Sequence, residues 1–236
     1  MEKTLIILHG WGLQGSKYDT LKNIFQKKGF RVYTPDFPGF GNQPIKKPGM
    51  TMDDYVIFLK DFYTSQNIKK AYVIGHSFGG RVAAKFATKY PTLIEKIVFT
   101  GSPLIKQKLS FKKRVVQSVV KKGKFLFDFT PSFLKDSMRW GIYRFIGEWD
   151  YYKAKNLREI FKKVISEDAS VYLDQIKNPV LVLWGKLDTV VPSKIGKMIA
   201  KKIPNAKYEE IADAGHAVIY RNSQSFAKKT LSFFNT

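Results

Sequence analysis

Short apolar runs alternate along much of the chain with segments whose apolar residues recur at helical spacing. The runs are continuous rather than alternately apolar and polar, which is typical of strands covered on both faces of a parallel sheet. Such alternation of strands and helices predicts an α/β fold with a mostly or wholly parallel, six-stranded sheet. The predicted strands are Leu5–Leu8, Arg31–Thr34, Ala71–Ile74, Ile97–Thr100, Val180–Trp184 and Lys207–Ile211.

Local start and stop signals place two of the helices. Thr51 and Asp54 have the spacing of a capping box, in which two side chains satisfy the first amides of a helix, and predict a helix that reaches Ser65. A second helix is predicted from Gly80 to Tyr90, and Pro91 closes it because proline cannot continue a helix.

The alternation stops between Leu104 and Asp174. This stretch shows no convincing strand, and positions such as Phe161, Val164 and Ile165 follow helical spacing. We therefore expect a helical insertion at 104–174, carried by a core formed from 1–103 and 175–236. The expected hinges lie at Ser102-Pro103 and Asn178-Pro179.

Composition adds a formal net charge of +22 at pH 7. A charge of this size is compatible with a nucleic acid, an anionic membrane or an acidic protein as partner. The basic residues are spread at similar density over the insertion and the rest of the chain, which disfavours a dedicated nucleic-acid patch.

One segment departs from this even spread. From Lys106 to Lys124 the chain has eight basic residues and no acidic one, interleaved with valines. The pattern fits an amphipathic basic helix, either as a solvated face of the insertion or as a docking surface for an acidic carrier protein or a membrane. The sequence favours the solvated face.

Several features that the sequence lacks narrow the class of protein. There is no cysteine, which excludes disulfides and thiolate metal sites, and three scattered histidines argue against a metal centre. No apolar run approaches the ~20 residues that a membrane span needs. A predicted strand begins almost at Met1, so we expect no signal peptide. We expect a cytoplasmic protein that needs no cofactor.

The sequence Gly75-His76-Ser77-Phe78-Gly79 lies between a predicted strand and a predicted helix. A Gly-x-Ser-x-Gly in this position is the signature of a nucleophile elbow, a turn so sharp that the serine adopts strained backbone angles and its hydroxyl is exposed above the sheet. The glycines are needed because a Cβ atom at either position would collide with the neighbouring strand and helix. Ser77 is therefore the candidate nucleophile.

A serine hydroxyl needs an imidazole to take its proton and a carboxylate to fix that imidazole. His216 lies on the loop after the last predicted strand, where this architecture places its base, whereas His9 and His76 follow earlier strands. Asp188 follows the strand Val180–Trp184 and gives the chain order serine, aspartate, histidine.

Other acidic residues fit the role of the carboxylate less well. Asp168 and Asp174 fall in a helical segment, and Asp213 is too close in sequence to the histidine to face its Nδ1 atom. Asp188 is therefore the candidate orienting residue.

Acyl transfer also requires backbone N–H groups that stabilise the oxyanion, by about 3–4 kcal/mol each. In the nucleophile-elbow architecture one donor is the residue after the serine, here Phe78, and the other comes from the loop after an early core strand. Trp11 lies on that loop, in His9-Gly10-Trp11-Gly12, and is the second candidate donor.

Together these motifs resemble those of the α/β-hydrolase family, in the family's order and over nearly the whole chain. The motifs are His9–Gly12, Asp36–Gly41, Gly75–Gly80, Trp184–Pro192 and Ala214–His216. Within the family the chain is similar to small bacterial carboxylesterases, and His9–Leu13 also resembles the methyl esterase that acts on pimeloyl carrier protein. The resemblance implies Ser77, Asp188 and His216 as catalytic triad, and Trp11 with Phe78 as oxyanion donors.

The resemblance also implies what the insertion is, and this chain departs from the family pattern at one place, its N-terminus. Family members carry a helical cap after the fourth strand of this kind, so 104–174 is expected to be that cap. Members usually begin with an antiparallel strand pair, and we expect this pair to be missing here because the first predicted strand starts almost at Met1.

The cap region is rich in aromatic residues that could line a substrate pocket, although most of them are expected to pack the cap's own helices. The candidates for contact with substrate are Trp140, Tyr143 and Phe125, with Phe127, Phe129, Trp149 and Tyr151 as further members of the set.

The sequence thus predicts a serine esterase for small to medium acyl chains. Lactone hydrolysis and C–C bond hydrolysis with the same triad remain open, as does a binding module for an acidic partner on a hydrolase scaffold. A dehalogenase or epoxide hydrolase is disfavoured, because those enzymes need an aspartate where Ser77 stands.

Overall fold

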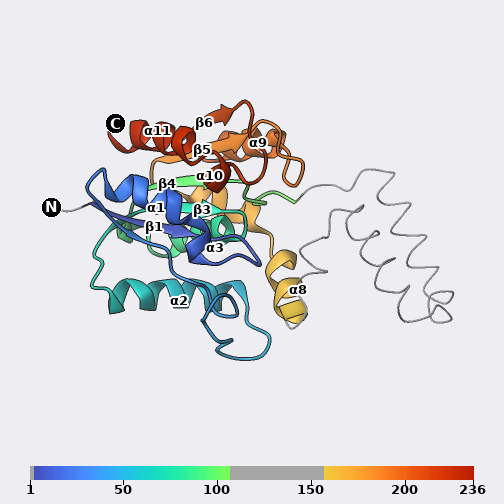
Figure 1. Cartoon of the computed structure of the whole chain (residues 1–236). Helices are drawn as coiled ribbons and strands as arrows, with labels where there is room; N and C mark the ends of the chain where they lie inside the picture. The colour runs from blue at the N-terminus through green and yellow to red at the C-terminus, as the bar shows by residue number, and fades with distance from the viewer. Residues whose placement is uncertain (1–2, 107–156) are drawn as a thin grey trace, which may run out of the picture. The chain divides into compact units, whose positions relative to one another are not determined.

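The computed structural model describes residues 3–106 and 157–236. The chain divides into two units, Met1–Lys106 with Lys163–Thr236 and Gln107–Lys162. The fold below is that of the described part of the first unit (Figure 1). The predicted helical cap falls mostly outside the described residues, so the boundaries 1–103, 104–174 and 175–236 stay a prediction.

Six strands form one sheet, in which every pair of neighbours is parallel. The strand order is β2-β1-β3-β4-β5-β6. The predicted α/β-hydrolase sheet, wholly parallel and without an antiparallel pair in the described part of the chain, is confirmed. The strands are β1 (Lys3–Leu8), β2 (Phe30–Tyr33), β3 (Ala71–His76), β4 (Ile94–Thr100), β5 (Val180–Gly185) and β6 (Ala206–Ile211).

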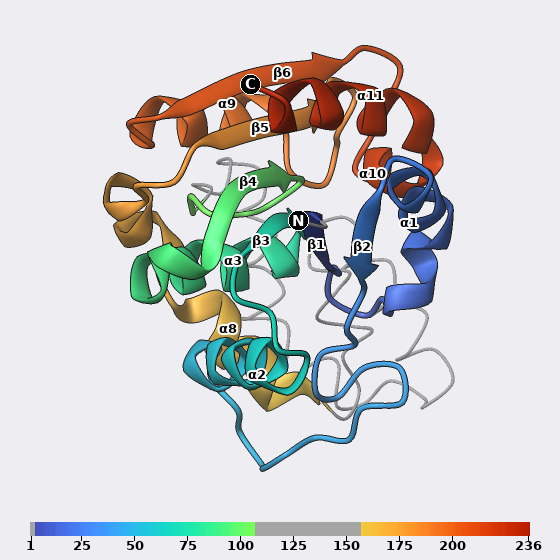
Figure 2. The same ribbon diagram turned by 90° about the vertical axis from the view of Figure 1, so that its left-hand side faces the viewer.

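The direction of each crossover decides which face of the sheet a helix covers, because parallel connections are right-handed. The chain moves one way from β1 to β2 and the other way from β2 onward, so α1 lies on one face and α2, α3 and α9 lie on the other (Figure 2). The helices α10 and α11 join α1. Their bounds are α1 (Asp19–Gln26), α2 (Met52–Ser65), α3 (Phe78–Lys89), α9 (Ser193–Lys202), α10 (Val218–Arg221) and α11 (Ser223–Phe234).

Shorter elements connect these helices and strands. Three 3-10 helices are present among the described residues, η1 (Gly15–Tyr18), η2 (Pro91–Leu93) and η4 (Ala169–Gln175), together with helix α8 (Arg158–Ser166). Both predicted helix signals are confirmed: α2 begins after Thr51, whose backbone N–H donates to the Asp54 carboxylate at 2.7 Å, and α3 ends two residues before Pro91.

The continuous apolar runs place side chains in a core on each side of the sheet. On the α1 and α11 side, Leu5, Ile74 and Leu181 are fully buried with Phe25 and Phe226 in one cluster.

No helix among the described residues combines the length and the apolar character that crossing a membrane requires. Because all strands run the same way, their carboxyl ends meet at one edge, where ligands of such sheets bind.

Helix α3 carries a buried cation that contacts chain segments on both sides of residues 107–162. Arg81 is 5% exposed, and its guanidinium donates to the carbonyl of Pro103 at 2.7 Å and to those of Val164 and Glu167 at 2.9 and 2.5 Å. Two of these carbonyls lie at the C-terminal end of α8, where carbonyls lack helical partners and attract cations. Arg81 thus compensates its own burial by satisfying three carbonyls at once.

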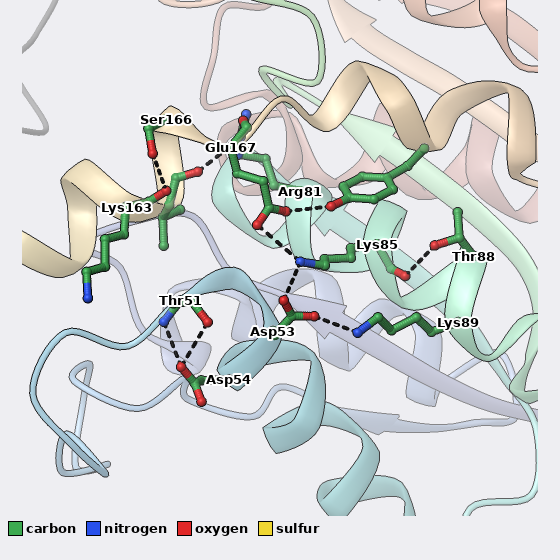
Figure 3. Close-up of polar contacts among 12 residues, drawn as sticks. Thr51, Asp53, Asp54, Arg81, Lys85, Thr88, Lys89, Lys163, Ser166 and Glu167 are labelled. Carbon is green, nitrogen blue, oxygen red and sulfur yellow. Dashed lines mark hydrogen bonds and ion pairs between the residues drawn. The ribbon is translucent and has the colours of Figure 1, made fainter.

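One turn further along α3, Lys85 forms a second buried contact in the same region (Figure 3). Its ammonium donates to Asp53 of α2 at 2.8 Å and to the Glu167 carboxylate at 3.1 Å. Hydrogen bonds from Lys85 and then Lys89 hold the pKa of the Asp53 carboxyl below its usual value. The helix that begins beside Ser77 is therefore fixed to α2 and to the segment around Glu167.

Replacement of Arg81 by methionine should lower the free energy of unfolding by at least about 3 kcal/mol, because three buried or partly buried carbonyls lose a charged donor while the apolar stem is kept. The matched control is Lys89→Met on the same helix. Lys89 is half exposed and pairs with Asp53, so its loss should change stability by less than about 1 kcal/mol. Urea unfolding followed by circular dichroism measures both, and equal losses would contradict this account of Arg81.

Candidate active site

Ser77 lies in a strained turn between β3 and α3. Its backbone angles are φ 51° and ψ −113°, a region that residues with a Cβ atom rarely adopt and that costs about 1–3 kcal/mol. A Cβ atom on Gly75 would lie 2.6 Å from the Gly80 Cα atom, and one on Gly79 would collide with the Leu8 carbonyl. The sharp turn therefore has the geometry that its glycines predicted, and Ser77 is half-buried while both of its neighbours are buried.

The Asp188 carboxylate and the His216 imidazole form a hydrogen bond, with 2.8 Å between Oδ2 and Nδ1. The carboxylate side chain is 1% exposed, and its other oxygen accepts from the backbone N–H groups of Val190 and Val191, each at 2.8 Å. A carboxylate only accepts, so the neutral imidazole carries its proton on Nδ1. Nε2 is then the nitrogen that can take a proton.

Backbone hydrogen bonds join the two loops that carry this pair. Leu187 N–H donates to the Ala214 carbonyl at 2.8 Å, and Lys186 N–H donates to the Ile211 carbonyl at 3.0 Å. The loop after β5 and the loop after β6 are thereby held together, and the distance between Asp188 and His216 is set by the backbone as well as by their side chains.

Contacts on both sides of Ser77 bring it next to this pair. The preceding residue, His76, lies with its ring centroid 5.1 Å from that of His216. Ser77 N–H donates to the Thr100 carbonyl at 3.0 Å, and at the next position, Gly101 (φ 55°), a Cβ atom would lie 2.8 Å from the His216 ring. The structure therefore brings the three predicted triad residues to one edge of the sheet, and the contact between the serine hydroxyl and Nε2 stays a prediction.

The two residues predicted as oxyanion donors are also neighbours. Phe78 is the first residue of α3, where backbone N–H groups have no partner within the helix and carry a partial positive charge. The Trp11 ring packs edge-on against the Phe78 ring, with 5.2 Å between centroids, and against Phe40 at 4.9 Å. These contacts place the loop after β1 beside the residue that follows the serine, and the roles of the two N–H groups stay a prediction.

The two remaining histidines are buried within the same edge, which the sequence did not reveal. His9 Nε2 accepts from Phe37 N–H at 2.9 Å, so Nδ1 carries the proton and donates to the Gly10 carbonyl at 2.8 Å. Burial lowers the pKa of His9. His9 therefore ties the loop after β1 to the Asp36–Gly41 loop as a neutral side chain.

His76 contacts Tyr18 and the backbone of His216. Its Nδ1 lies 2.8 Å from the Tyr18 hydroxyl oxygen, and its Nε2 lies 3.2 Å from the His216 carbonyl oxygen. Burial, and then the nearby His216, lower the pKa of His76 to about 3. No signal in the sequence marked Tyr18, because it lies in an ordinary helical stretch 58 positions from its partner.

Other predicted features of the site cannot be compared with the structure. The candidate substrate contacts Trp140, Tyr143 and Phe125 lie outside the described residues, as does the basic segment Lys106–Lys124 apart from its first residue, which donates to the Ser166 carbonyl at 2.9 Å. Within residues 3–106 and 157–236, no group of three or more histidine, aspartate or glutamate side chains is placed to hold a metal ion.

Comparison with known proteins gives matches over almost the whole chain. A family model described as alpha/beta hydrolase fold matches residues 3–121 and 152–223. A 2-hydroxy-6-oxononadienedioate/2-hydroxy-6-oxononatrienedioate hydrolase of Paraburkholderia phymatum is 27% identical over 252 residues, which cover 98% of this chain and 87% of that protein. A Mycoplasma pneumoniae protein assigned as an esterase/lipase is 25% identical, with coverage of 91% and 82%. The crystal structure of a bromoperoxidase from Bacillus anthracis superimposes with a TM-score of 0.76 at 24% identity, covering 100% of this chain and 93% of that one, which supports the fold.

The low pKa of His76 predicts how stability changes with pH. Below pH 6.5 the unfolded chain binds a proton at this histidine that the folded protein does not bind until about pH 3, so the free energy of unfolding falls as the pH falls through this window. His76→Gln should remove about 1.4 kcal/mol per pH unit of that slope between about pH 5.5 and 4.5. Urea titrations at a series of pH values measure the slope, and an unchanged slope in the variant would contradict the assignment of a buried neutral histidine.

Proposed function

The chain belongs to the alpha/beta hydrolase fold family, and we propose that it is a serine hydrolase that cleaves carboxylic esters of small to medium acyl chains. The observation that carries the proposal is the 2.8 Å hydrogen bond between Asp188 and His216, located beside a serine in a strained turn. This arrangement supplies a base with a fixed tautomer next to a candidate nucleophile, which is what an otherwise unreactive hydroxyl needs.

In the proposed first half-reaction, the Ser77 hydroxyl attacks the ester carbonyl carbon while His216 Nε2 takes its proton. The carbonyl π electrons move to oxygen, and the resulting oxyanion is stabilised by the N–H groups of Phe78 and Trp11. Asp188 stabilises the imidazolium that forms, because its carboxylate already accepts from Nδ1. Collapse of the tetrahedral intermediate breaks the bond to the alkoxy group, which leaves as an alcohol after taking the proton from His216.

The second half-reaction repeats these steps with water. His216 removes a proton from a water molecule, whose oxygen attacks the acyl-enzyme carbonyl, and the same two N–H groups stabilise the second oxyanion. Collapse releases the carboxylic acid and returns the proton to Ser77. A lactone would follow the same course, except that the acid and the alcohol leave as one molecule.

A second candidate function is hydrolysis of a C–C bond, favoured by the relative that acts on 2-hydroxy-6-oxononadienedioate and aligns with 98% of this chain. The same serine, base and oxyanion donors would serve such a reaction. The difference lies in the leaving group, because cleavage of a C–C bond leaves an electron pair on carbon that must be delocalised as an enolate, whereas an ester releases an alkoxide. The two candidates are therefore separated by substrate and not by the nucleophile.

Loss of the proposed nucleophile or of its orienting carboxylate should abolish ester hydrolysis. Ser77→Ala should lower kcat/KM for p-nitrophenyl butyrate by at least about 10³-fold, and Asp188→Asn by about 10²–10⁴-fold because the amide favours the wrong imidazole tautomer. The matched control is Asp213→Asn, an exposed acid on the His216 loop, which should leave the rate unchanged. A fluorophosphonate probe should label the wild type and not Ser77→Ala.

If the wild type hydrolyses the ester no faster than Ser77→Ala, the enzyme proposal is wrong. In that event, affinity for an acidic carrier protein that falls steeply with added salt would support the binding module instead.

A substrate panel decides between the two hydrolytic candidates. We expect kcat/KM for p-nitrophenyl acetate or butyrate, or for a simple lactone, to exceed that for 2-hydroxy-6-oxononadienedioate by at least about tenfold, since a difference of that size corresponds to about 1.4 kcal/mol of transition-state stabilisation. Steady-state assays with purified protein over a range of acyl chain lengths provide the comparison. The reverse order would favour the C–C hydrolase.

A further inference from the structure

Four residues from three regions of the sequence form a continuous series of hydrogen bonds beside the proposed active site. Gly10 N–H lies 3.1 Å from the Tyr18 hydroxyl, that hydroxyl lies 2.8 Å from His76 Nδ1, and His76 Nε2 lies 3.2 Å from the His216 carbonyl. Tyr18 is completely buried and His76 is 1% exposed. Their polar atoms face one another rather than solvent.

The donor and acceptor of every hydrogen bond in this series are fixed by the backbone groups at its two ends, the Gly10 N–H and the His216 carbonyl. The His216 carbonyl can only accept, so His76 Nε2 carries the proton and donates to it. His76 Nδ1 is then an acceptor and receives the Tyr18 O–H, while the Tyr18 oxygen accepts from Gly10 N–H. Burial raises the pKa of Tyr18, which keeps its hydroxyl protonated as this arrangement requires.

At its Gly10 end, the series of hydrogen bonds fixes the orientation of the backbone that carries the proposed oxyanion donor. Tyr18 holds Gly10 by its N–H, while the Gly10 carbonyl accepts from His9 Nδ1 at 2.8 Å and from Leu13 N–H at 3.2 Å. The peptide between Gly10 and Trp11 is trans, so the Trp11 N–H points opposite to the Gly10 carbonyl. Fixing Gly10 on both sides therefore fixes the direction of the Trp11 N–H.

At its other end, the series of hydrogen bonds reaches the backbone carbonyl of the proposed base, His216. His216 is fixed through its side chain by Asp188 and through its carbonyl by His76. His76 directly precedes Ser77, and a Cβ atom on Gly10 would lie 3.1 Å from the His76 Nδ1 atom and 3.3 Å from the Ser77 Cβ atom. These hydrogen-bonded residues therefore pass beside the serine and join the loop after β1 to the loop after β6.

We propose that Tyr18 and His76 are positioning residues. Together they form a buried relay of hydrogen bonds that fixes the position of the Trp11 N–H relative to the His216 imidazole, on either side of Ser77. The proposal rests on the proposed function, because it assigns a catalytic consequence to the placement of that base and that donor. The relay transfers no proton and contacts no substrate. It acts by keeping two catalytic groups, from the loops after β1 and β6, at a constant separation while charge develops between them.

A neutral His76 suits this role. Protonation of Nδ1 would turn an acceptor into a donor and break the bond from Tyr18, and burial keeps the pKa of His76 at about 3. The ionisable groups packed around it are Tyr18, Tyr220, His216 and His9, and a charge on either of these two histidines would further oppose its protonation.

The first test removes one hydroxyl. Tyr18→Phe should lower kcat for p-nitrophenyl butyrate by about 10–10²-fold with KM changed less than about twofold, because a displaced oxyanion donor acts on the transition state and not on substrate binding. Affinity for an alkylboronic acid, which forms a tetrahedral adduct with an activated serine, should fall by a similar factor. The matched control is Tyr63→Phe: Tyr63 is equally buried, its hydroxyl has no hydrogen-bond partner among the described residues, and its loss should leave kcat unchanged.

The second test separates the two arms of the relay at His76. In His76→Asn the amide oxygen can replace Nδ1 as acceptor but the side chain is too short to reach the His216 carbonyl, whereas in His76→Gln the amide can reach that carbonyl but offers no acceptor at the position of Nδ1. Tyr18→Phe should therefore cause a smaller further loss of kcat on the His76→Gln background than on the His76→Asn background. Equal further losses on the two backgrounds would contradict the relay.

The outcomes distinguish this inference from the proposed function. If Ser77→Ala is inactive while Tyr18→Phe keeps kcat within about twofold of wild type, the relay is wrong and the serine hydrolase stands. If Ser77→Ala is as active as wild type, the proposed function fails first. Each variant is assayed well below its own melting temperature, and a loss of kcat that disappears on cooling would show a merely structural role and overturn the inference.

Discussion

The hydrogen bond between the Asp188 carboxylate and the His216 imidazole is the interaction on which the site depends. It sets the imidazole tautomer, and it is itself set by backbone bonds between the loops after β5 and β6. A carboxylate buried to 1% exposure requires compensation, which Val190 and Val191 supply together with the imidazole. One carboxylate oxygen thus holds the backbone of its own loop, while the other orients the histidine.

The parallel sheet is what makes this meeting possible. Ser77 follows β3, Asp188 follows β5 and His216 follows β6, so the three lie at one edge because their strands run in the same direction. Packing then refines the arrangement. Arg81 and Lys85 fix the helix that begins beside the serine, and Tyr18 and His76 join the loop after β1 to the loop after β6.

The parts that could be predicted from the sequence are those with a local signal. Continuous apolar runs marked all six strands within a few residues, and the glycines around Ser77 marked the turn, because each depends on neighbours in sequence. Tyr18 and Arg81 gave no such signal: their partners are 58 and up to 86 positions away, and a buried tyrosine or arginine has no characteristic spacing. His9 and His76 were noticed but given no role, since only the fold shows which nitrogen of each ring donates. The substrate contacts expected at Trp140, Tyr143 and Phe125 fall outside the described residues.

The most direct measurement is a crystal structure of the protein after reaction with a fluorophosphonate, whose tetrahedral phosphorus imitates the acylation intermediate. The account predicts a bond from phosphorus to Ser77 Oγ, a phosphonyl oxygen at about 2.7–3.1 Å from the backbone nitrogens of both Phe78 and Trp11, and His216 Nε2 facing Oγ with Asp188 behind it. An adduct on a different residue, or an imidazole directed away from Ser77 in the adduct, would contradict it.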